Sequence, residues 1–232
     1  MSIKKQKKKK KTKPLISPGV KLFLILLLIP ISVTVYSLIF FTWENLRPIL
    51  HSFSQSDAEK IQAEFDLQIP EEYIPIYISA AEAYNIPWTL LAAHHRVETR
   101  FSTMKSLISP VGAEGPMQFM PCTFVGWSHP SCSDLGEGNI PEAEKTNPEI
   151  IKKYGGYGVD ANADGVADPF NLEDAIYSAA NYLSKSGASK GDLEKAIFNY
   201  NHSEEYVENI LYYYHQYEEV SEDLIRTVYY DQ

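Results

Sequence analysis

An apolar run near the amino terminus is the feature that most constrains this chain. Residues 22–41 read LFLILLLIPISVTVYSLIFF, 20 residues without a charged side chain. A helix of that length spans about 30 Å, the thickness of the hydrocarbon layer of a bilayer. A cleaved signal peptide has a shorter apolar core and a small-x-small cleavage site, and no such site follows here. The run therefore predicts one uncleaved transmembrane helix, which we assign to residues 20–41.

The charges on either side of this run predict its orientation. Residues 1–13 contain eight lysines and no acid, whereas the rest of the chain has 13 Lys and Arg against 30 Asp and Glu, a net charge of -17. Lysine-rich flanks stay on the cytoplasmic side of a membrane. We therefore expect a single-pass protein of the plasma membrane, with a cytoplasmic tail at residues 1–19 and the remainder outside. An acidic body also argues against nucleic acid as a partner.

The sequence after the apolar run predicts a stalk and then a helical body. Residues 42–69 are polar and weakly patterned, and residues 70–232 contain repeated helical stripes. Residues 102–170, between those stripes, are rich in Gly, Pro, Ser and Asn. Because no convincing strand alternation occurs, the fold class that we expect is all-α with a long irregular central segment. The last stripe follows Ser203 as N-cap and consists of Tyr206, Val207, Ile210, Leu211 and Tyr214.

One carboxylate lies at the end of a predicted helix. The stretch NIPWTLLAAHHRVETRF, residues 85–101, has Asn85 as its cap and Glu98 in its last turn. Glu98 borders the apolar stripe of this helix. A glutamate on a helix is commonly solvent-exposed, whereas a carboxyl beside apolar groups has a raised pKa and can act as an acid. The helix alone leaves both interpretations open. Its stripe consists of Leu90, Ala93, Val97 and Phe101.

A loop-like segment favours the second interpretation. Residues 109–121, SPVGAEGPMQFMP, contain Gly112 and Gly115, which permit positive φ angles or the close approach of a ligand. Met117 and Phe119 flank Gln118, whose side chain both donates and accepts hydrogen bonds. This composition suits the wall of a polar cleft of the size of a sugar.

Three motifs, in their order along the chain, resemble those of the lytic transglycosylases of the goose-lysozyme superfamily. They are VETRF at the helix end, SPVGAEGPMQFMP in the loop and AIFNYNHS further on. Those enzymes carry a Glu-Ser-x-Phe helix end, a Gly-Leu-Met-Gln loop and a later Tyr-Asn pair. The resemblance runs from about residue 69 to residue 217. In this chain Thr99 replaces the usual Ser, Pro116 replaces the usual Leu, and residues 122–157 are an expansion.

The resemblance implies a lysozyme-like domain that cleaves the β-1,4 bond between MurNAc and GlcNAc in peptidoglycan glycan strands. Glu98 would act first as general acid and then as base. The substrate's own N-acetyl group would attack the anomeric carbon, and the muramyl 6-hydroxyl would then displace it. The product would be a 1,6-anhydromuramyl end, and the chemistry would require no cofactor. The cleft residues that we expect are Ser109, Met117, Gln118, Phe119, Tyr200 and Asn201.

Two other functions stay open from the sequence. A hydrolytic muramidase of the same fold would use water in place of the 6-hydroxyl. An inactive wall-binding module of a secretion or conjugation apparatus would have lost activity, although intact Glu98 and Gln118 argue against that. Most glycosidases also need a second carboxylate, for which Glu114 and Asp134 are the candidates in the loop segment.

Residues 160–171, DANADGVADPFN, match an EF-hand calcium loop at positions 1, 3, 5, 6 and 9. Position 12 should be a bidentate Glu, but Asn171 stands there, so Glu173 or Asp174 would have to substitute. The alternative is an Asx-rich turn without metal. The ligands that we expect for a structural Ca²⁺ are Asp160, Asn162, Asp164, Val166 through its carbonyl, and Asp168.

Cys122 and Cys132 both follow the predicted membrane helix and so lie outside the cell, where a disulfide is allowed. Such a bond would stabilise the fold by roughly 2.5–3 kcal/mol on the loop-entropy model. The alternative is a pair of free thiols.

Overall fold

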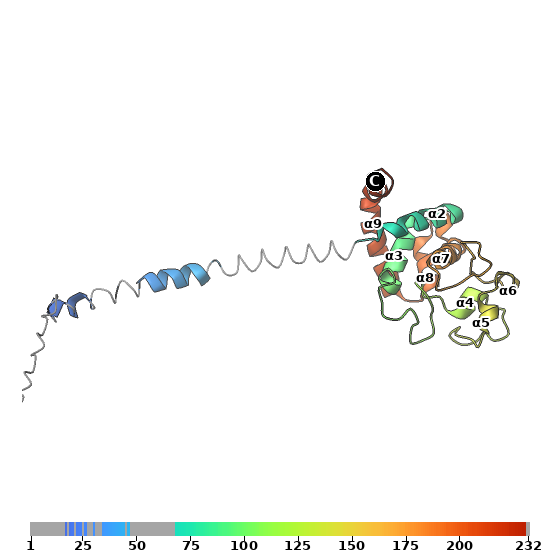
Figure 1. The fold of residues 1–232 in the computed structure, drawn as a ribbon, viewed down its shortest axis with the longest axis horizontal. Coiled ribbons are helices and arrows are strands. Elements are labelled where there is room, and N and C mark those ends of the chain that lie inside the picture. The colour runs from blue at the N-terminus through green and yellow to red at the C-terminus, as the bar shows by residue number, and fades with distance from the viewer. Residues whose placement is uncertain are drawn as a thin grey trace, which may run out of the picture. The chain divides into compact units, whose positions relative to one another are not determined.

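The computed structural model of the chain describes residues 17, 19–20, 22–24, 26, 30, 34–44, 46 and 68–230. The chain divides into two units, Met1–Glu64 and Phe65–Gln232, and each is described by itself (Figure 1). Most of the predicted stalk, residues 47–67, lies outside the described part.

In the first unit the described residues from 19 onward are helical, and their large apolar side chains are exposed. Within the described residues of the chain, no helix combines the length and the apolar character that crossing a membrane requires. The span predicted at residues 20–41 includes positions outside the described part. The transmembrane helix therefore stays a prediction.

The regular secondary structure of the second unit's described residues consists of helices joined by loops, which confirms the expected all-α class there. Apart from helices and loops it contains only isolated bridges, such as Glu114 with Phe119. The 3₁₀ helices are η1 (Glu71–Tyr73) and η2 (Ala188–Lys190). The α-helices are α2 (Ile74–Tyr84), α3 (Trp88–Thr99), α4 (Pro121–Val125), α5 (Glu142–Lys145), α6 (Pro148–Tyr154), α7 (Leu172–Ser186), α8 (Leu193–Tyr200) and α9 (Glu204–Tyr230).

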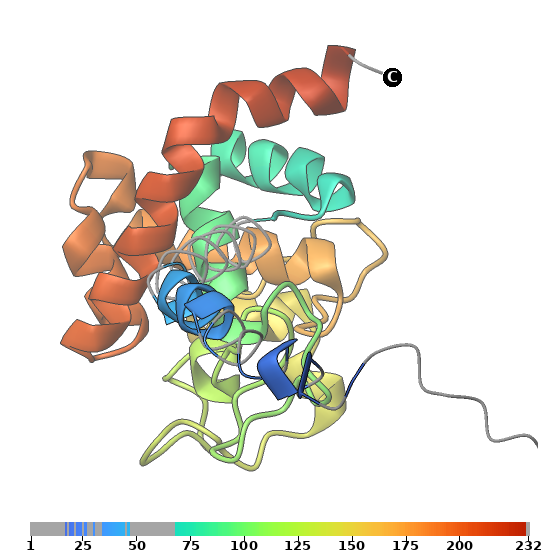
Figure 2. The ribbon, with the colours of Figure 1, turned by 90° about the vertical axis from the view of Figure 1, so that its left-hand side faces the viewer.

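Helix α3 lies at the centre of this unit, because α2, α7 and α9 all pack against it. Figure 1 shows α9 running beside α3, and Figure 2 shows the last turns of α9 extending past the other helices of the unit. The sequence predicts one apolar stripe on α3, but its neighbours bury more than one face. The buried side chains are Thr89, Leu90, Leu91, Ala92, Ala93, His94, His95 and Thr99.

The cap predicted at Asn85 is wrong. Asn85 instead ends α2 in the left-handed conformation, with φ of 53°, and extended Pro87 precedes α3. Asparagine suits both positions, because its side chain can cap a helix start and its backbone tolerates positive φ. The sequence pattern therefore places the break between the two helices correctly but not the role of Asn85.

The chain turns sharply after α3. Arg100, Phe101 and Ser102 have φ values of 51°, 57° and 63° in succession, a region that non-glycine residues rarely adopt. The turn is closed by hydrogen bonds, including one from the Arg100 amide to the Arg96 carbonyl at 3.0 Å. It directs the chain from the end of α3 into the irregular segment.

The irregular central segment contains α4, α5 and α6 and is fastened by side chains. A disulfide joins Cys122 to Cys132. The Lys145 ammonium group lies 2.7 Å from Glu114 Oε1 and 2.9 Å from Glu142 Oε2. Because Glu114 belongs to the loop at residues 109–121, this ion pair connects that loop to α5.

Gly115 allows the same loop to approach the residues before α7. Its φ is +78°, and a Cβ atom there would lie 1.7 Å from the Pro169 carbonyl oxygen. Its own carbonyl accepts a hydrogen bond from the Gln118 amide at 3.1 Å. A side chain at position 115 would therefore push the loop away from the backbone at Pro169.

We expect Gly115→Ala to lower the free energy of unfolding by about 3 kcal/mol, because the methyl group meets rigid backbone. Gly155→Ala is a matched control, since Gly155 has φ of +75° and nothing within 4 Å of the added Cβ. Positive φ alone should cost the control about 1–2 kcal/mol. Urea unfolding of both variants measures the difference. Equal losses in the two variants would show that the close approach at Gly115 does not matter.

Candidate active site

The carboxyl group of Glu98 is held by a tyrosine from another helix. Glu98 Oε1 accepts a hydrogen bond of 2.5 Å from the Tyr206 hydroxyl. Tyr206 lies in the first turn of α9, and its amide donates to Ser203 Oγ at 3.3 Å, as expected of an N-cap at Ser203. Since α9 packs along α3, the start of α9 fixes the orientation of the acid.

Burial raises the pKa of the Glu98 carboxyl to about 7, and the hydrogen bond from Tyr206 acts in the opposite direction. The low-dielectric surroundings disfavour the charged form, whereas a donor to the carboxylate favours it. A carboxyl with this pKa keeps much of its proton near neutral pH, whereas an exposed glutamate is ionised. Of the two interpretations that the sequence leaves open, the structure supports the partly buried acid.

His94, one turn before Glu98, is buried beside Tyr206 and Tyr200. Its ring centre lies 5.1 Å from that of Tyr200 and 6.0 Å from that of Tyr206. Its Nδ1 donates to the Leu90 carbonyl at 2.8 Å, and its buried Nε2 has no hydrogen-bond partner in the described part of the chain. Burial lowers the pKa of His94 to about 4. The imidazole is therefore neutral near pH 7 and places no positive charge beside Glu98.

Two hydrogen bonds bring the three resembling motifs together. Thr99 Oγ1 donates to the Pro116 carbonyl at 2.7 Å, and the Tyr200 hydroxyl donates to the Met117 carbonyl at 2.7 Å. The substitution of Thr for the usual Ser keeps the hydroxyl that makes the first bond. The loop is thus fixed to the end of α3 and to the end of α8 through two consecutive carbonyls.

Gln118 lines a cavity, and the loop backbone holds its side-chain amide. Its amide nitrogen donates to the Leu107 carbonyl at 3.0 Å and to the Gly115 carbonyl at 2.8 Å. With both hydrogens engaged, only the Oε1 oxygen is left for a ligand. Gln118, Phe119 and Tyr200 line a cavity of about 220 Å³, whose other walls come from the 122–157 expansion and from α7 and α8.

The remaining cleft residues predicted from sequence are placed differently. The Met117 side chain is fully buried, so its contribution is its carbonyl. Ser109 Oγ accepts from the amides of Val111 at 3.3 Å and Ala113 at 2.9 Å, within its own loop. Asn201 is exposed just after α8 and does not line this cavity. Substrate binding by Ser109 and Asn201 stays a prediction.

Neither candidate for a second carboxylate is bonded to the Glu98 group. Glu114 is paired with Lys145 at 2.7 Å. Asp134 accepts a hydrogen bond from Ser133 Oγ at 3.1 Å in an exposed loop. The arrangement suits chemistry that uses a single carboxyl group.

Sequence reasoning missed two residues of this site, Tyr206 and His94. Tyr206 was expected in an apolar stripe, and in the structure its ring stacks with Tyr200 at 6.5 Å while its hydroxyl reaches Glu98. A tyrosine combines an apolar ring with a polar tip, so its place in a stripe does not reveal what the hydroxyl meets. For His94 the sequence does contain a signal, because its spacing of four residues from Glu98 places both side chains on one face of the helix.

The loop at residues 160–168 is closed by its own hydrogen bonds. The Gly165 amide donates to Asp160 Oδ2 at 2.9 Å, and the Val166 amide donates to Asp164 Oδ1 at 2.9 Å. Within the described residues, no three or more His, Cys, Asp or Glu side chains come together as a metal-binding group. The loop therefore has the bonding of an Asx-rich turn.

The oxygen atoms of this loop still fit calcium in type, since calcium takes carboxylate and carbonyl oxygens. The bidentate carboxylate is what the site lacks. Asn171 caps α7 by accepting from the Glu173 amide at 2.9 Å. Asp174 is buried and accepts from the loop amides of Ala161 at 2.8 Å and Asp168 at 2.9 Å.

Residues 150–194 match the family model described as Transglycosylase SLT domain. The matched segment is less than half of the chain, and it covers most of α6, all of α7 and the start of α8. It supports a relationship to lytic transglycosylases at the level of the family. It does not include Glu98, Gln118 or Tyr200, so the roles of these residues rest on their geometry and on the motifs. No curated protein and no solved structure matches the chain.

We expect Glu98→Gln to stabilise the fold at alkaline pH. Because the pKa of Glu98 rises on folding from 4.5 to about 7, the wild-type protein loses stability as pH increases through that interval. Glutamine stays neutral, so the variant should gain about 3 kcal/mol over the wild type at pH 8.5 and little below pH 4.5. Urea unfolding at both pH values measures this.

The matched control is Glu219→Gln, an exposed position on α9. It should show no pH-dependent difference from the wild type. If the Glu98 and Glu219 variants behave alike, Glu98 is not held in its neutral form by the fold.

Proposed function

We propose that the protein is a peptidoglycan lytic transglycosylase that cleaves the β-1,4 bond between MurNAc and GlcNAc. The observation that carries the proposal is the partly buried Glu98, whose pKa of about 7 keeps a proton available and whose carboxyl is oriented by Tyr206. The match to the SLT family supports this class of enzyme and peptidoglycan as its substrate.

In the first step, the Glu98 carboxyl donates its proton to the glycosidic oxygen, and the bond from that oxygen to the muramyl anomeric carbon breaks. The carbonyl oxygen of the substrate's N-acetyl group forms the new bond to the anomeric carbon. General acid catalysis is most effective when the pKa of the acid lies near the working pH. The Tyr206 hydroxyl, which donates to Glu98 Oε1, stabilises the carboxylate that this step leaves.

In the second step, the Glu98 carboxylate removes the proton from the muramyl 6-hydroxyl. The 6-oxygen then attacks the anomeric carbon and displaces the N-acetyl oxygen. Glu98 regains its proton, the product has a 1,6-anhydromuramyl end, and no water is consumed. Because the nucleophiles belong to the substrate, the chemistry needs no second carboxylate, in keeping with the separate ion pair of Glu114 with Lys145.

We expect purified peptidoglycan digested by the protein to yield muramyl ends that are lighter by one water and resistant to borohydride. Mass spectrometry of the released muropeptides measures both properties. Glu98→Gln should abolish their formation, because an amide cannot donate the proton. Reducible muramyl ends that depend on Glu98 would instead identify a hydrolytic muramidase. Intact glycan strands with the wild type would identify a wall-binding module without activity.

We also propose that residues 20–41 anchor the protein in the plasma membrane, with the catalytic unit outside. The support is the uncharged apolar run and the eight lysines that precede it. Retention of the chain in the lipid fraction after extraction at high pH would agree with an anchor, and release would contradict it.

We further propose that the loop at residues 160–168 binds calcium weakly as a structural ion. Asp160, Asn162 and Asp164 would supply side-chain oxygens, and Val166 would supply its carbonyl oxygen. Asp168 would be the ligand at position 9 of the EF-hand pattern. The oxygen-only donor set supports this, and the missing bidentate carboxylate makes the affinity low.

Millimolar calcium should raise the melting temperature of the protein, because an ion that binds only the folded state stabilises it by mass action. Asp164→Ala should remove the response. Magnesium at the same concentration controls for ionic strength. Identical melting curves with and without calcium would favour the Asx-rich turn without metal.

A further inference from the structure

The cavity beside Gln118 and Tyr200 has an outer wall that the family resemblance does not cover. Trp127 and Leu135 line it, and both belong to the 122–157 expansion. Trp127 is 52% exposed and Leu135 is 74% exposed. Large apolar side chains left exposed around a concave site commonly mark a surface that binds a ligand.

The segment that carries Trp127 makes close backbone contacts. The preceding residue, Gly126, has φ of +119°, and a Cβ there would lie 2.2 Å from the Tyr154 carbonyl oxygen. A Cβ at Gly136 would lie 2.9 Å from the indole. The ring of Trp127 therefore rests directly on the backbone at Gly136, and its chain is packed against α6.

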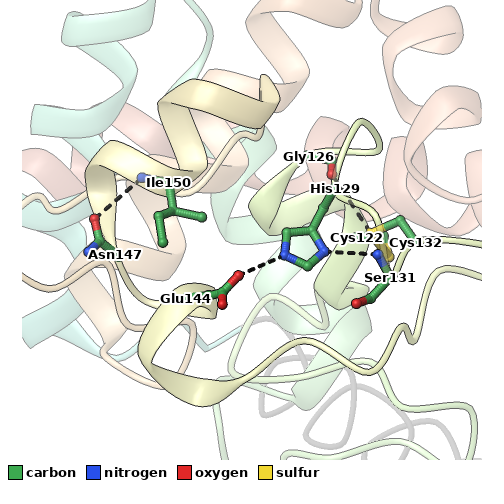
Figure 3. A network of polar contacts seen from close by, with 8 residues as sticks. All are labelled: Cys122, Gly126, His129, Ser131, Cys132, Glu144, Asn147 and Ile150. Carbon is green, nitrogen blue, oxygen red and sulfur yellow. Dashed lines mark hydrogen bonds and ion pairs between the residues drawn. A yellow bond between two sulfur atoms is a disulfide. The ribbon is translucent and has the colours of Figure 1, made fainter.

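A network of side chains fastens the loop that carries Trp127. Figure 3 shows the Cys122–Cys132 disulfide on one side of His129 and Glu144 of α5 on the other. His129 Nε2 lies 3.0 Å from Glu144 Oε2, and its Nδ1 accepts from the Ser131 amide at 3.2 Å. A loop fixed in this way loses little conformational entropy when a ligand binds.

Other residues that line the cavity are also held by hydrogen bonds and ring contacts. The Tyr182 hydroxyl donates to the Asn199 carbonyl at 2.6 Å, and the Tyr182 and Tyr200 rings meet edge to face at 5.2 Å. Gln118 contributes its Oε1 acceptor, because both of its amide hydrogens are engaged. The lining thus combines the half-exposed indole of Trp127 with the side-chain amide of Gln118.

We propose that this cavity is a saccharide subsite in which the Trp127 indole stacks on the apolar face of one N-acetylhexosamine ring while Gln118 Oε1 accepts from its amide N–H. A pyranose has an apolar C–H face and a polar edge, which matches the Trp127 indole and the Gln118 amide. The volume of about 220 Å³ lies below the roughly 300–1,000 Å³ of sites for larger ligands, so it suits a single ring.

The subsite extends the proposed function, because it would hold a sugar next to the one whose bond Glu98 cleaves. A purely structural role for Trp127, covering the disulfide, would bury the indole. Its half-exposed position in the cavity wall favours the binding role. The disulfide and the His129–Glu144 pair then position the loop that carries Trp127.

The test uses the full-length chain with Glu98→Gln, so that no bond is cleaved, and the trimer of N-acetylglucosamine as probe. Isothermal titration calorimetry should show roughly tenfold weaker binding when Trp127→Ala is added, and a smaller loss with Trp127→Phe, which keeps an aromatic face. Tyr212→Ala is the matched control, because Tyr212 is an exposed aromatic residue, at 56%, that does not line this cavity. It should bind the probe as the parent does.

With Glu98 intact, Trp127→Ala should raise KM on purified peptidoglycan roughly tenfold and leave kcat within about twofold, because the indole binds substrate without taking part in proton transfer. Unchanged probe binding with Trp127→Ala, or no binding by the parent, would overturn the subsite. Cleavage of peptidoglycan together with probe binding that ignores Trp127 would overturn the subsite alone. Probe binding that depends on Trp127 without any cleavage would support the subsite and contradict the proposed function.

Discussion

Enclosing a carboxyl group at the end of α3 is unfavourable when that group is charged, and the site depends on how the fold manages this. Burial raises the pKa of Glu98 to about 7, and the Tyr206 hydroxyl limits the rise by donating to the carboxylate. The neutral His94 imidazole adds no competing charge. Glu98 is therefore poised between its two protonation states, as a group that must first give and then take a proton requires.

The loop that carries Gln118 is bonded to Thr99, the residue after the acid, and to Tyr200. Thr99 and Tyr200 bond two consecutive carbonyls of the loop at 2.7 Å each, so α3 and α8 set its position jointly. Gly115 lets the loop lie against the backbone before α7. Because these contacts come from separate parts of the chain, the cavity wall is fixed before any ligand binds. Such preorganisation reduces the entropy lost on binding.

The sequence predicted those features that short motifs encode, namely the helical class, Glu98 at a helix end and the loop around Gln118. It did not predict the partner of Glu98, because Tyr206 reaches the acid only through the packing of α9 on α3. Asn85 was misplaced because one residue type serves both ends of a helix. The sequence did not predict that Trp127 lines the cavity, because this depends on contacts within the 122–157 expansion, which the motifs do not cover.

The titration midpoint of the Glu98 side-chain carboxyl, followed by carbon-13 NMR of the full-length chain labelled at glutamate, tests the central claim most directly. We expect a midpoint near pH 7 in the wild type. We also expect a higher midpoint in Tyr206→Phe, because that substitution removes the hydrogen bond that favours the charged form. A wild-type midpoint near the ordinary value of 4.5, unchanged in Tyr206→Phe, would contradict a proton held by the fold.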